Sequence, residues 1–298
     1  MTHAVLGAPT GTAPHARSGR AGIPFVLCAD DYALSPGVSR AILDLLERGR
    51  LSATSCMSIR PEWARHASWL RSYVGRVDLG LHFTLTDHRP LGPMPRLAPG
   101  GRLPTLGGLL RLAFAGRLDP EEIAAELDRQ LAAFVAHLGH PPDYVDGHQH
   151  VHQLPVVRDV LVRRLAGSGS YVRLCAERPA TIVRRGVAVP KALFIAGLGL
   201  GLRRLLVRHG IRHNAGFGGV YAFDTRASFG HLFERFVHGI GPGALVMCHP
   251  GFPDDVLREV DRLVEPRLPE HRWLAGPGFR DLLDRHGLRL ARLVDCGR

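Results

Sequence analysis

Lysine is almost absent from this chain of 298 residues, because arginine supplies nearly all of its 38 basic side chains and Lys191 is the only exception. With 27 acidic residues, the formal net charge is +11. The arginines are spread over the whole length, which indicates a compositional bias more than one binding face. No helix-turn-helix, RNP or zinc-finger pattern accompanies them, so we expect no nucleic-acid partner.

Long hydrophobic runs are missing as well. No run reaches the roughly 20 apolar residues that a membrane-spanning helix needs, so we expect no transmembrane segment. The nearest candidate, residues 192–202, is short and carries three glycines. We interpret it as a core helix, although contact with lipid or a greasy substrate at the surface is an alternative that the pattern leaves open.

Paired cysteine motifs and targeting signals are also lacking. The five cysteines include no C-x-x-C pair and mostly lie in apolar runs, which indicates reduced, buried thiols in a cytoplasmic protein. Residues 1–22 contain no basic region followed by an apolar one, the pattern of a secretory signal peptide. We expect them to form a disordered leader before a single domain over residues 23–298.

From residue 24 onward, short apolar runs alternate with amphipathic stretches. Ser35-Pro36 and Asp119-Pro120 each supply an N-cap followed by a proline at the first helical position. The expected strands are 24–30, 52–58, 77–86, 144–150, 171–175, 216–223, 244–249 and 288–294. The expected helices are 36–49, 61–72, 119–138, 155–166, 191–209, 227–239 and 273–286. Residues 87–118 are rich in Pro, Gly and Arg, and we interpret them as a functional loop, such as a lid or substrate wall.

This alternation predicts an α/β fold with a mostly parallel sheet, either doubly wound or a (β/α) barrel. Polar residues gather at the carboxyl ends of separate strands, where barrels collect their catalytic groups: Asp30-Asp31, His82, His148 and His249. No Gly-rich phosphate turn follows the first strand, which argues against a nucleotide-binding sheet. We therefore favour a TIM-like (β/α) barrel.

The adjacent acids Asp30-Asp31 end an apolar strand, where buried carboxylates must be paired or bound to a metal. Neighbouring side chains on a strand point to opposite sides, but where the chain turns both can reach one site. A salt-bridged pair or a helix cap is the alternative interpretation.

The stretch 146–152, Asp-Gly-His-Gln-His-Val-His, carries three histidines at alternate positions, which a strand would place on one face. Imidazole suits Zn, Fe, Co or Ni, and a carboxylate admits harder ions as well. A metal ligand normally has a partner that fixes its tautomer, and Asp146 or His150 fits that role.

Two further histidines are isolated. His82 lies within an apolar strand, where a core histidine is the alternative, and His249 lies at a strand exit before Pro-Gly, which fits either general acid catalysis or a structural role. Together these groups make an Asp/His/His metal site with a spare carboxylate and a further histidine. That combination is typical of metal-assisted hydrolysis.

Four blocks in this order resemble the YdjC-like carbohydrate deacetylases, which include chitooligosaccharide deacetylases and proteins associated with hopanoid biosynthesis. The blocks are Val26-Leu-Cys-Ala-Asp-Asp-Tyr32, Gly80-Leu-His-Phe-Thr-Leu-Thr86, the 146–152 stretch and Cys248-His-Pro-Gly251. The resemblance covers nearly the whole chain. It implies a distorted (β/α) barrel with a divalent ion, commonly Mg or Zn, and it points to a homodimer.

Carried over by position, the resemblance makes Asp31, His82 and His148 metal ligands, Asp30 the general base and His249 the acid. It places Arg173, Asn214 and Phe217 near the substrate. The chain departs from the family where Tyr32-Ala33 replaces Phe-Gly, and where Gly147 and Gln149 replace a frequent serine and histidine. None of these departures removes a metal ligand, but they bear on which sugar is bound.

We therefore expect a hydrolase that removes the N-acetyl group from an acetylated amino sugar. The alternatives are the same chemistry on a lipid-linked sugar, and a sugar-binding barrel without turnover. A non-haem iron oxygenase also uses two histidines and a carboxylate. Such enzymes usually carry an acid two residues after a ligand histidine, which neither His82 nor His148 has.

Overall fold

The computed structural model describes residues 22–224 and 227–297. The leader expected over residues 1–22 therefore lies outside the described residues, apart from Gly22. The strands are β1 (Ile23–Tyr32), β2 (Ala53–Cys56), β3 (Asp78–Phe83), β4 (Tyr144–Gly147), β5 (Tyr171–Val172), β6 (Phe217–Gly218), β7 (Ala244–Cys248) and β8 (Leu288–Leu290).

Helices follow most of the strands. They are α1 (Pro36–Glu47), α2 (Trp63–Leu70), α3 (Leu106–Phe114), α4 (Pro120–Leu138), α5 (Val157–Leu165), α6 (Pro179–Arg185), α7 (Val189–Arg208), α8 (Phe229–Val237), α9 (Asp255–Val260), α10 (Arg267–Ala275) and α11 (Pro277–His286). Short 3-10 segments are η1 (Arg71–Tyr73), η2 (His148–Gln153) and η3 (Leu293–Asp295).

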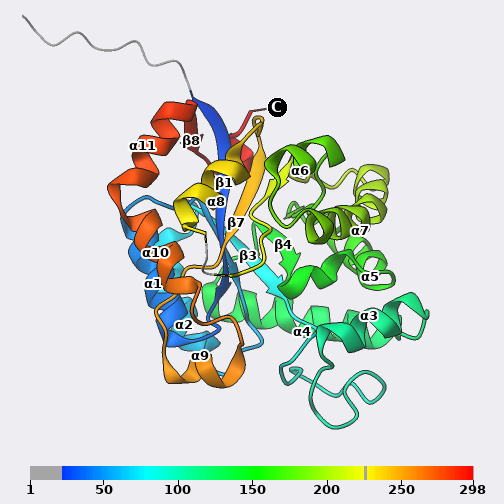
Figure 1. The fold of residues 1–298 in the computed structure, drawn as a ribbon. Coiled ribbons are helices and arrows are strands. Elements are labelled where there is room, and N and C mark those ends of the chain that lie inside the picture. The colour runs from blue at the N-terminus through cyan, green and yellow to red at the C-terminus, as the bar shows by residue number, and fades with distance from the viewer. Residues whose placement is uncertain (1–21, 225–226, 298) are drawn as a thin grey trace, which may run out of the picture.

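The strands form one parallel, curled sheet in the order β5-β4-β3-β2-β1-β7-β6, and β8 pairs with the start of β1. Helices α1, α2 and α10 cover one side of it, and α5 and α7 cover the other (Figure 1). Within the described residues, β5 and β6 do not pair as strands, and the bridge between Val172 and His213 spans this seam. The fold is thus the predicted α/β arrangement, a distorted and incompletely closed (β/α) barrel.

The order of strands and helices follows the expectation, and the differences are helices that are added or divided. Ser35 accepts a hydrogen bond from the Val38 N–H at 3.2 Å, which confirms the predicted start of α1. The loop expected over 87–118 contains α3, and the helix expected over 273–286 is two helices, because α10 ends at Ala275 and Pro277 begins α11. Helices α6 and α9 were not expected.

No helix in the described part of the chain has both the length and the apolar character needed to cross a bilayer. The cysteines at 28, 56, 175, 248 and 296 are all free and buried, as the sequence predicts. The segment 192–202 belongs to α7, which buries one face and exposes another.

His66 of α2 gives the fold a dependence on pH. Its side chain is fully buried and pairs with the Ser39 hydroxyl at 2.6 Å, and burial lowers the pKa of its ring to about 4. The unfolded chain, with an ordinary histidine pKa near 6.5, binds a proton in the interval where the folded chain does not, so stability falls as the pH drops from about 6.5 to about 4. We expect His66→Gln to remove up to about 3 kcal/mol of that loss. Urea unfolding of both proteins at a series of pH values checks this, and parallel stability curves would contradict it.

Candidate metal and catalytic site

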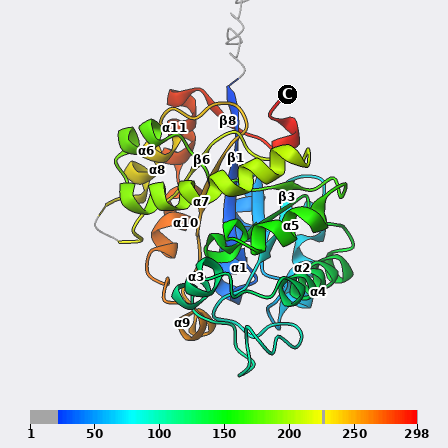
Figure 2. The same cartoon turned by 90° about the vertical axis from the view of Figure 1, so that its right-hand side faces the viewer.

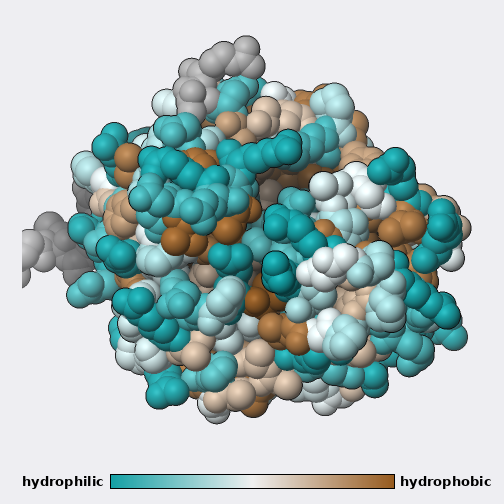
Figure 3. Space-filling view, turned by 90° about the horizontal axis from the view of Figure 1, so that it is seen from below, coloured by the Kyte–Doolittle hydropathy of each residue, from teal (hydrophilic) through white to brown (hydrophobic). Residues whose placement is uncertain are grey.

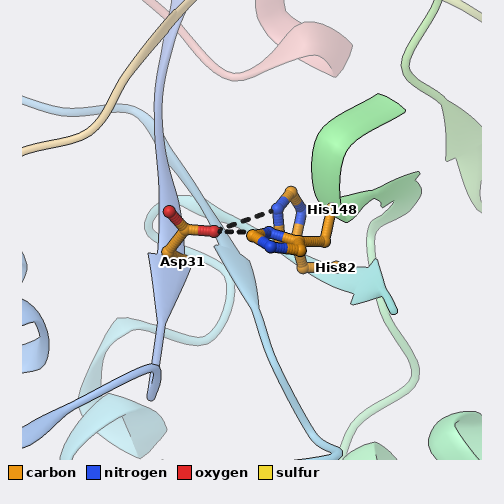
Figure 4. A group of neighbouring side chains, drawn as sticks. All are labelled: Asp31, His82 and His148. Carbon is orange, nitrogen blue, oxygen red and sulfur yellow. Dashed lines mark hydrogen bonds and ion pairs between the residues drawn. The ribbon is translucent and has the colours of Figure 1, made fainter. Parts of the chain in front are cut away.

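Three side chains from separate strand ends meet at the carboxyl edge of the sheet. Asp31 is the second-last residue of β1, His82 lies in β3 and His148 directly follows β4. The Asp31 Oδ1 atom lies 3.3 Å from Nε2 of His82 and 3.0 Å from Nδ1 of His148 (Figure 4). One donor atom from each residue lies within 4.8 Å of the other two, which is the spacing of ligands around one cation.

A local distortion of β1 explains how two adjacent acids serve one site. Asp31 adopts the left-handed region with φ 67°, and the pairing of β1 with β2 shifts register between Ala29 and Tyr32. A bulge of this kind re-aims a side chain that a regular strand would direct to the other face. Asp30 and Asp31 are therefore both buried at the same edge of the sheet, each 2% exposed.

Asp30 is held by Arg173 through two hydrogen bonds of 2.7 and 2.8 Å, in the bidentate arrangement typical of arginine and carboxylate. Burial alone would raise the pKa of Asp30, but the charge of Arg173 outweighs it and lowers that pKa. Arg173 also lies 3.0 Å from Oδ2 of Asp146. Asp30 is thus an ionised carboxylate next to the three candidate ligands.

His82 is oriented from behind by Asp146, whose Oδ1 lies 2.6 Å from the Nδ1 atom of the ring. This contact supports the interpretation of Asp146 as the partner that orients a candidate ligand. Burial opposes protonation of His82, but the charge of Asp146 and hydrogen bonds to Asp146 and Asp31 raise its pKa to about 10. Asp146 in turn accepts a 2.5 Å hydrogen bond from the Ser55 hydroxyl, which lies 2.7 Å from the Tyr144 hydroxyl.

The prediction of a strand through residue 150, with three histidines on one face, is wrong. The strand ends at Gly147, and Gln149 and His150 adopt the left-handed region within η2. Only His148 of the three enters the site, because the turn directs His152 to the backbone oxygen of Arg173 and brings His150 against Phe217.

His249 lies just after β7, with its Nε2 atom 3.8 Å from Oδ2 of Asp30. Burial lowers the pKa of His249 to about 4, so its ring is neutral at rest. The Phe223 ring lies perpendicular to the His249 ring, with 5.1 Å between the ring centres. The Lys191 ammonium lies 4.5 Å from the Phe223 ring centre and donates to the Tyr221 carbonyl at 2.9 Å. The start of α7 therefore forms the side of the site next to His249.

Two buried residues of α10 support the site and were not found from the sequence. Arg267 donates to Oδ2 of Asp31 at 2.7 Å and to Asp261 at 2.6 Å, so Asp31 has only Oδ1 facing the histidines. Glu270 accepts the backbone N–H of His249 at 2.6 Å and the hydroxyl of Tyr221. Arg267 lies 236 residues from Asp31, and Glu270 lies 21 residues from His249; no local pattern marks either of them.

The two remaining predicted residues lie at the seam between β5 and β6. The Asn214 amide pairs with the N–H and carbonyl of Leu174 and with the Gly216 carbonyl, all at 2.7–2.9 Å. Its hydrogen bonds therefore join the two edges of the sheet. Phe217 is a buried residue of β6. Contact of either residue with a substrate stays a prediction.

A cavity of about 380 Å³ opens beside His148. Its wall includes Asp87, His88, Arg102 and Thr105, which come from the 87–118 segment, and residues 258–262 on the other side. The surface at this end of the sheet is hollowed, with hydrophilic side chains around the hollow (Figure 3). This agrees with the interpretation of 87–118 as a substrate wall.

The donor set fits a divalent ion. One carboxylate oxygen and two imidazole nitrogens face one point, which is a ligand set used for Zn and, with water, for harder ions. Asp146 turns Nε2 of His82 toward that point, and Arg267 holds the second oxygen of Asp31 away from it. Asp30 stays outside the set because Arg173 occupies both of its oxygens.

Comparison with known proteins identifies the family of the chain. A family model described as YdjC-like protein matches residues 24–285. Chitooligosaccharide deacetylases of Yersinia pestis and Yersinia pseudotuberculosis are 33% identical over 273 residues, which cover 91% of this chain and 98% of theirs. An Enterococcus faecalis protein named for cellobiose-phosphate cleavage has a solved structure that covers 93% of this chain and 100% of its own, with 18% identity and a TM-score of 0.71, and it shares the fold. The chain belongs to the YdjC-like protein family.

Proposed function

We propose that this protein is a metal-dependent deacetylase that hydrolyses the N-acetyl group of an acetylated amino sugar, with chitooligosaccharide-like glycans as its substrate class. The proposal rests on the convergence of Asp31, His82 and His148 on one point. The ionised carboxylate of Asp30 lies beside them and is bound by Arg173. The names of the relatives support the same substrate class.

The ion would be held by Asp31, His82 and His148, and we expect Mg²⁺ or Zn²⁺. When bound, a divalent ion supplies Lewis acidity, which makes an amide carbonyl more electrophilic and water more acidic. The rest of the chemistry belongs to the side chains. Asp30 accepts the proton of the attacking water, while Arg173 fixes the position of its carboxylate.

His249 is the proposed acid for the departing nitrogen. Its ring is neutral at rest, so it must gain a proton during the reaction before it can donate one. Asp30 is the carboxylate beside it, 3.8 Å away, and is the group that receives the proton from water. The bonds and protons of the reaction then balance. The oxygen of water joins the acetyl carbon and leaves in acetate, the C–N bond breaks, and the proton that Asp30 took from water passes through His249 to the departing amine.

Acetate release from a panel of N-acetylated oligosaccharides tests the proposal. We expect release that a chelator abolishes and that added Mg²⁺ or Zn²⁺ restores. No release from any member of the panel in the presence of metal would contradict it. Tight binding of a sugar without release would instead support a non-catalytic sugar-binding barrel.

Metal removal should also lower stability, because an ion that binds only the folded chain stabilises it by mass action. At an ion concentration about 100-fold above Kd this amounts to about 2.7 kcal/mol. For a chain of this size we expect chelation to lower Tm by on the order of 5 °C. Differential scanning calorimetry with and without metal measures the shift.

His148→Ala is the matched control for that measurement, since it removes one candidate ligand but leaves the arginine pairs of Asp30 and Asp31 in place. Its Tm should not respond to metal. An equal metal-dependent shift in wild type and His148→Ala would show that the ion binds elsewhere.

A further inference from the structure

The charges of the chain are distributed unevenly around α6 and α7. Residues 178–223 contain no Asp or Glu, although the whole chain has 27 acidic residues. The same segment carries eight basic side chains: Arg178, Arg184, Arg185, Lys191, Arg203, Arg204, Arg208 and Arg212. A basic stretch of this length favours an anionic partner.

The same two helices also expose apolar side chains. Of the large hydrophobic residues that are exposed in the described part of the chain, five lie here: Val183, Leu193, Phe194, Leu200 and Val207. Phe194 is 52% exposed, Leu200 53% and Val207 66%. Aromatic and aliphatic side chains exposed together in this way mark a contact surface.

Helical spacing places the exposed residues of α7 on one side. Leu193, Leu200 and Val207 recur every seven residues, while Ile195, Leu202 and others on the opposite side are buried in the fold. In Figure 2, α7 crosses the outside of the molecule. We call the surface of Leu193, Phe194, Leu200, Arg204, Val207 and Arg208 the α7 face.

The arginines of the α7 face are free to meet a partner. Among residues 22–224 and 227–297, the ion pairs do not include Arg203, Arg204 or Arg208. A cavity of about 280 Å³ beside Leu200 is lined by Arg178 and Arg203. Glu177 also lines this cavity, but it is paired with Arg185 at 3.2 Å.

We infer that the α7 face docks on the surface of an anionic lipid bilayer, an inference that goes beyond the proposed deacetylase activity. The apolar side chains enter the boundary between head groups and acyl chains, and the arginines bind lipid phosphates. A second copy of the chain fits this face less well, because a two-fold contact would bring its arginines against one another. The first turn of α7 carries Lys191, which contacts Phe223 beside His249, so docking brings the bilayer next to the catalytic cleft.

Co-sedimentation with vesicles tests the inference, using phosphatidylcholine vesicles with and without phosphatidylglycerol. We expect binding that requires phosphatidylglycerol and weakens as salt screens the charges. Arg204→Gln with Arg208→Gln should weaken binding by about 25-fold, since each arginine near an anionic surface is worth about fivefold. Phe194→Ser with Leu200→Ser should weaken it by about tenfold or more.

Matched controls change the same residue types elsewhere on the surface. Phe114→Ser alters a phenylalanine of α3 that is somewhat more exposed than Phe194, and Arg65→Gln with Arg285→Gln removes two exposed arginines. These variants should bind within about twofold of wild type, because neither lies on the proposed docking surface.

Three results would overturn the inference: no binding to anionic vesicles, equal binding to phosphatidylcholine alone, or binding that the α7 variants leave unchanged. A wild-type dimer that Phe194→Ser with Leu200→Ser dissociates, without vesicle binding, would assign the face to a second copy instead. Acetate release from a soluble oligosaccharide should stay at the wild-type level in both α7 variants. Failure of vesicle binding is thereby distinguished from failure of the proposed activity.

Discussion

Asp30→Asn is expected to lower kcat by about 10²–10⁴-fold, the range that a positioned general base contributes. Asparagine has nearly the same shape and still accepts a hydrogen bond from Arg173, but it cannot take a proton from water. Because Asp30 is not one of the candidate ligands, metal affinity should change little. Steady-state acetate release and a calorimetric metal titration measure the two effects separately.

Asp143→Asn is the control for this substitution. Asp143 also sits beside a strand and an arginine, but it precedes β4, at the opposite end of the sheet from the site. We expect its acetate release to stay close to wild type. Full activity in Asp30→Asn would show that another group accepts the proton.

Arg173→Gln is expected to cost about 3–5 kcal/mol of unfolding free energy, because it leaves two carboxylates buried without their cation. Arg173 is fully buried and lies against both Asp30 and Asp146, so the loss is a large part of the 5–15 kcal/mol that stabilises a typical domain. Arg48→Gln breaks an exposed pair with Asp44 and should cost less than about 1 kcal/mol. Urea unfolding measures both.

A double substitution separates this charge effect from simple loss of packing. Asp30→Asn removes one of the two charges that Arg173→Gln leaves unpaired, so the two together should cost less than the sum of the single changes. Additive losses would contradict the role assigned to the charge of Arg173. Arg173→Lys keeps the charge but not the two parallel hydrogen bonds, and should recover part of the stability.

The ends of these strands could be predicted because each strand is a short apolar run that a polar residue follows. Parallel strands bring their carboxyl ends to one edge, so Asp31, His82 and His148 were expected together and are together. The course of the chain after residue 147 could not be read in the same way. Alternating histidines fit a strand, but Gln149 and His150 turn with positive φ, and tertiary packing overrides the local pattern.

The supporting shell of the site was beyond prediction for a different reason. Arg267 reaches Asp31 across 236 positions of sequence, and Glu270 of the same helix contacts the backbone N–H of His249. One buried arginine or glutamate in an amphipathic helix carries no periodic signal that separates it from a surface residue. Asn214 was named by the family resemblance, but its place at the seam was not expected, since its hydrogen bonds are to backbone groups that only the folded sheet brings near.

The solitary lysine of the chain gives the site a built-in position for a reporter group. Lys191 is exposed at the start of α7, and its ammonium lies over the Phe223 ring that contacts His249. Apart from the amino terminus, Lys191 therefore carries the one amine that an amine-directed reagent can modify. A fluorophore attached there would sense events in the cleft without any substitution in the protein.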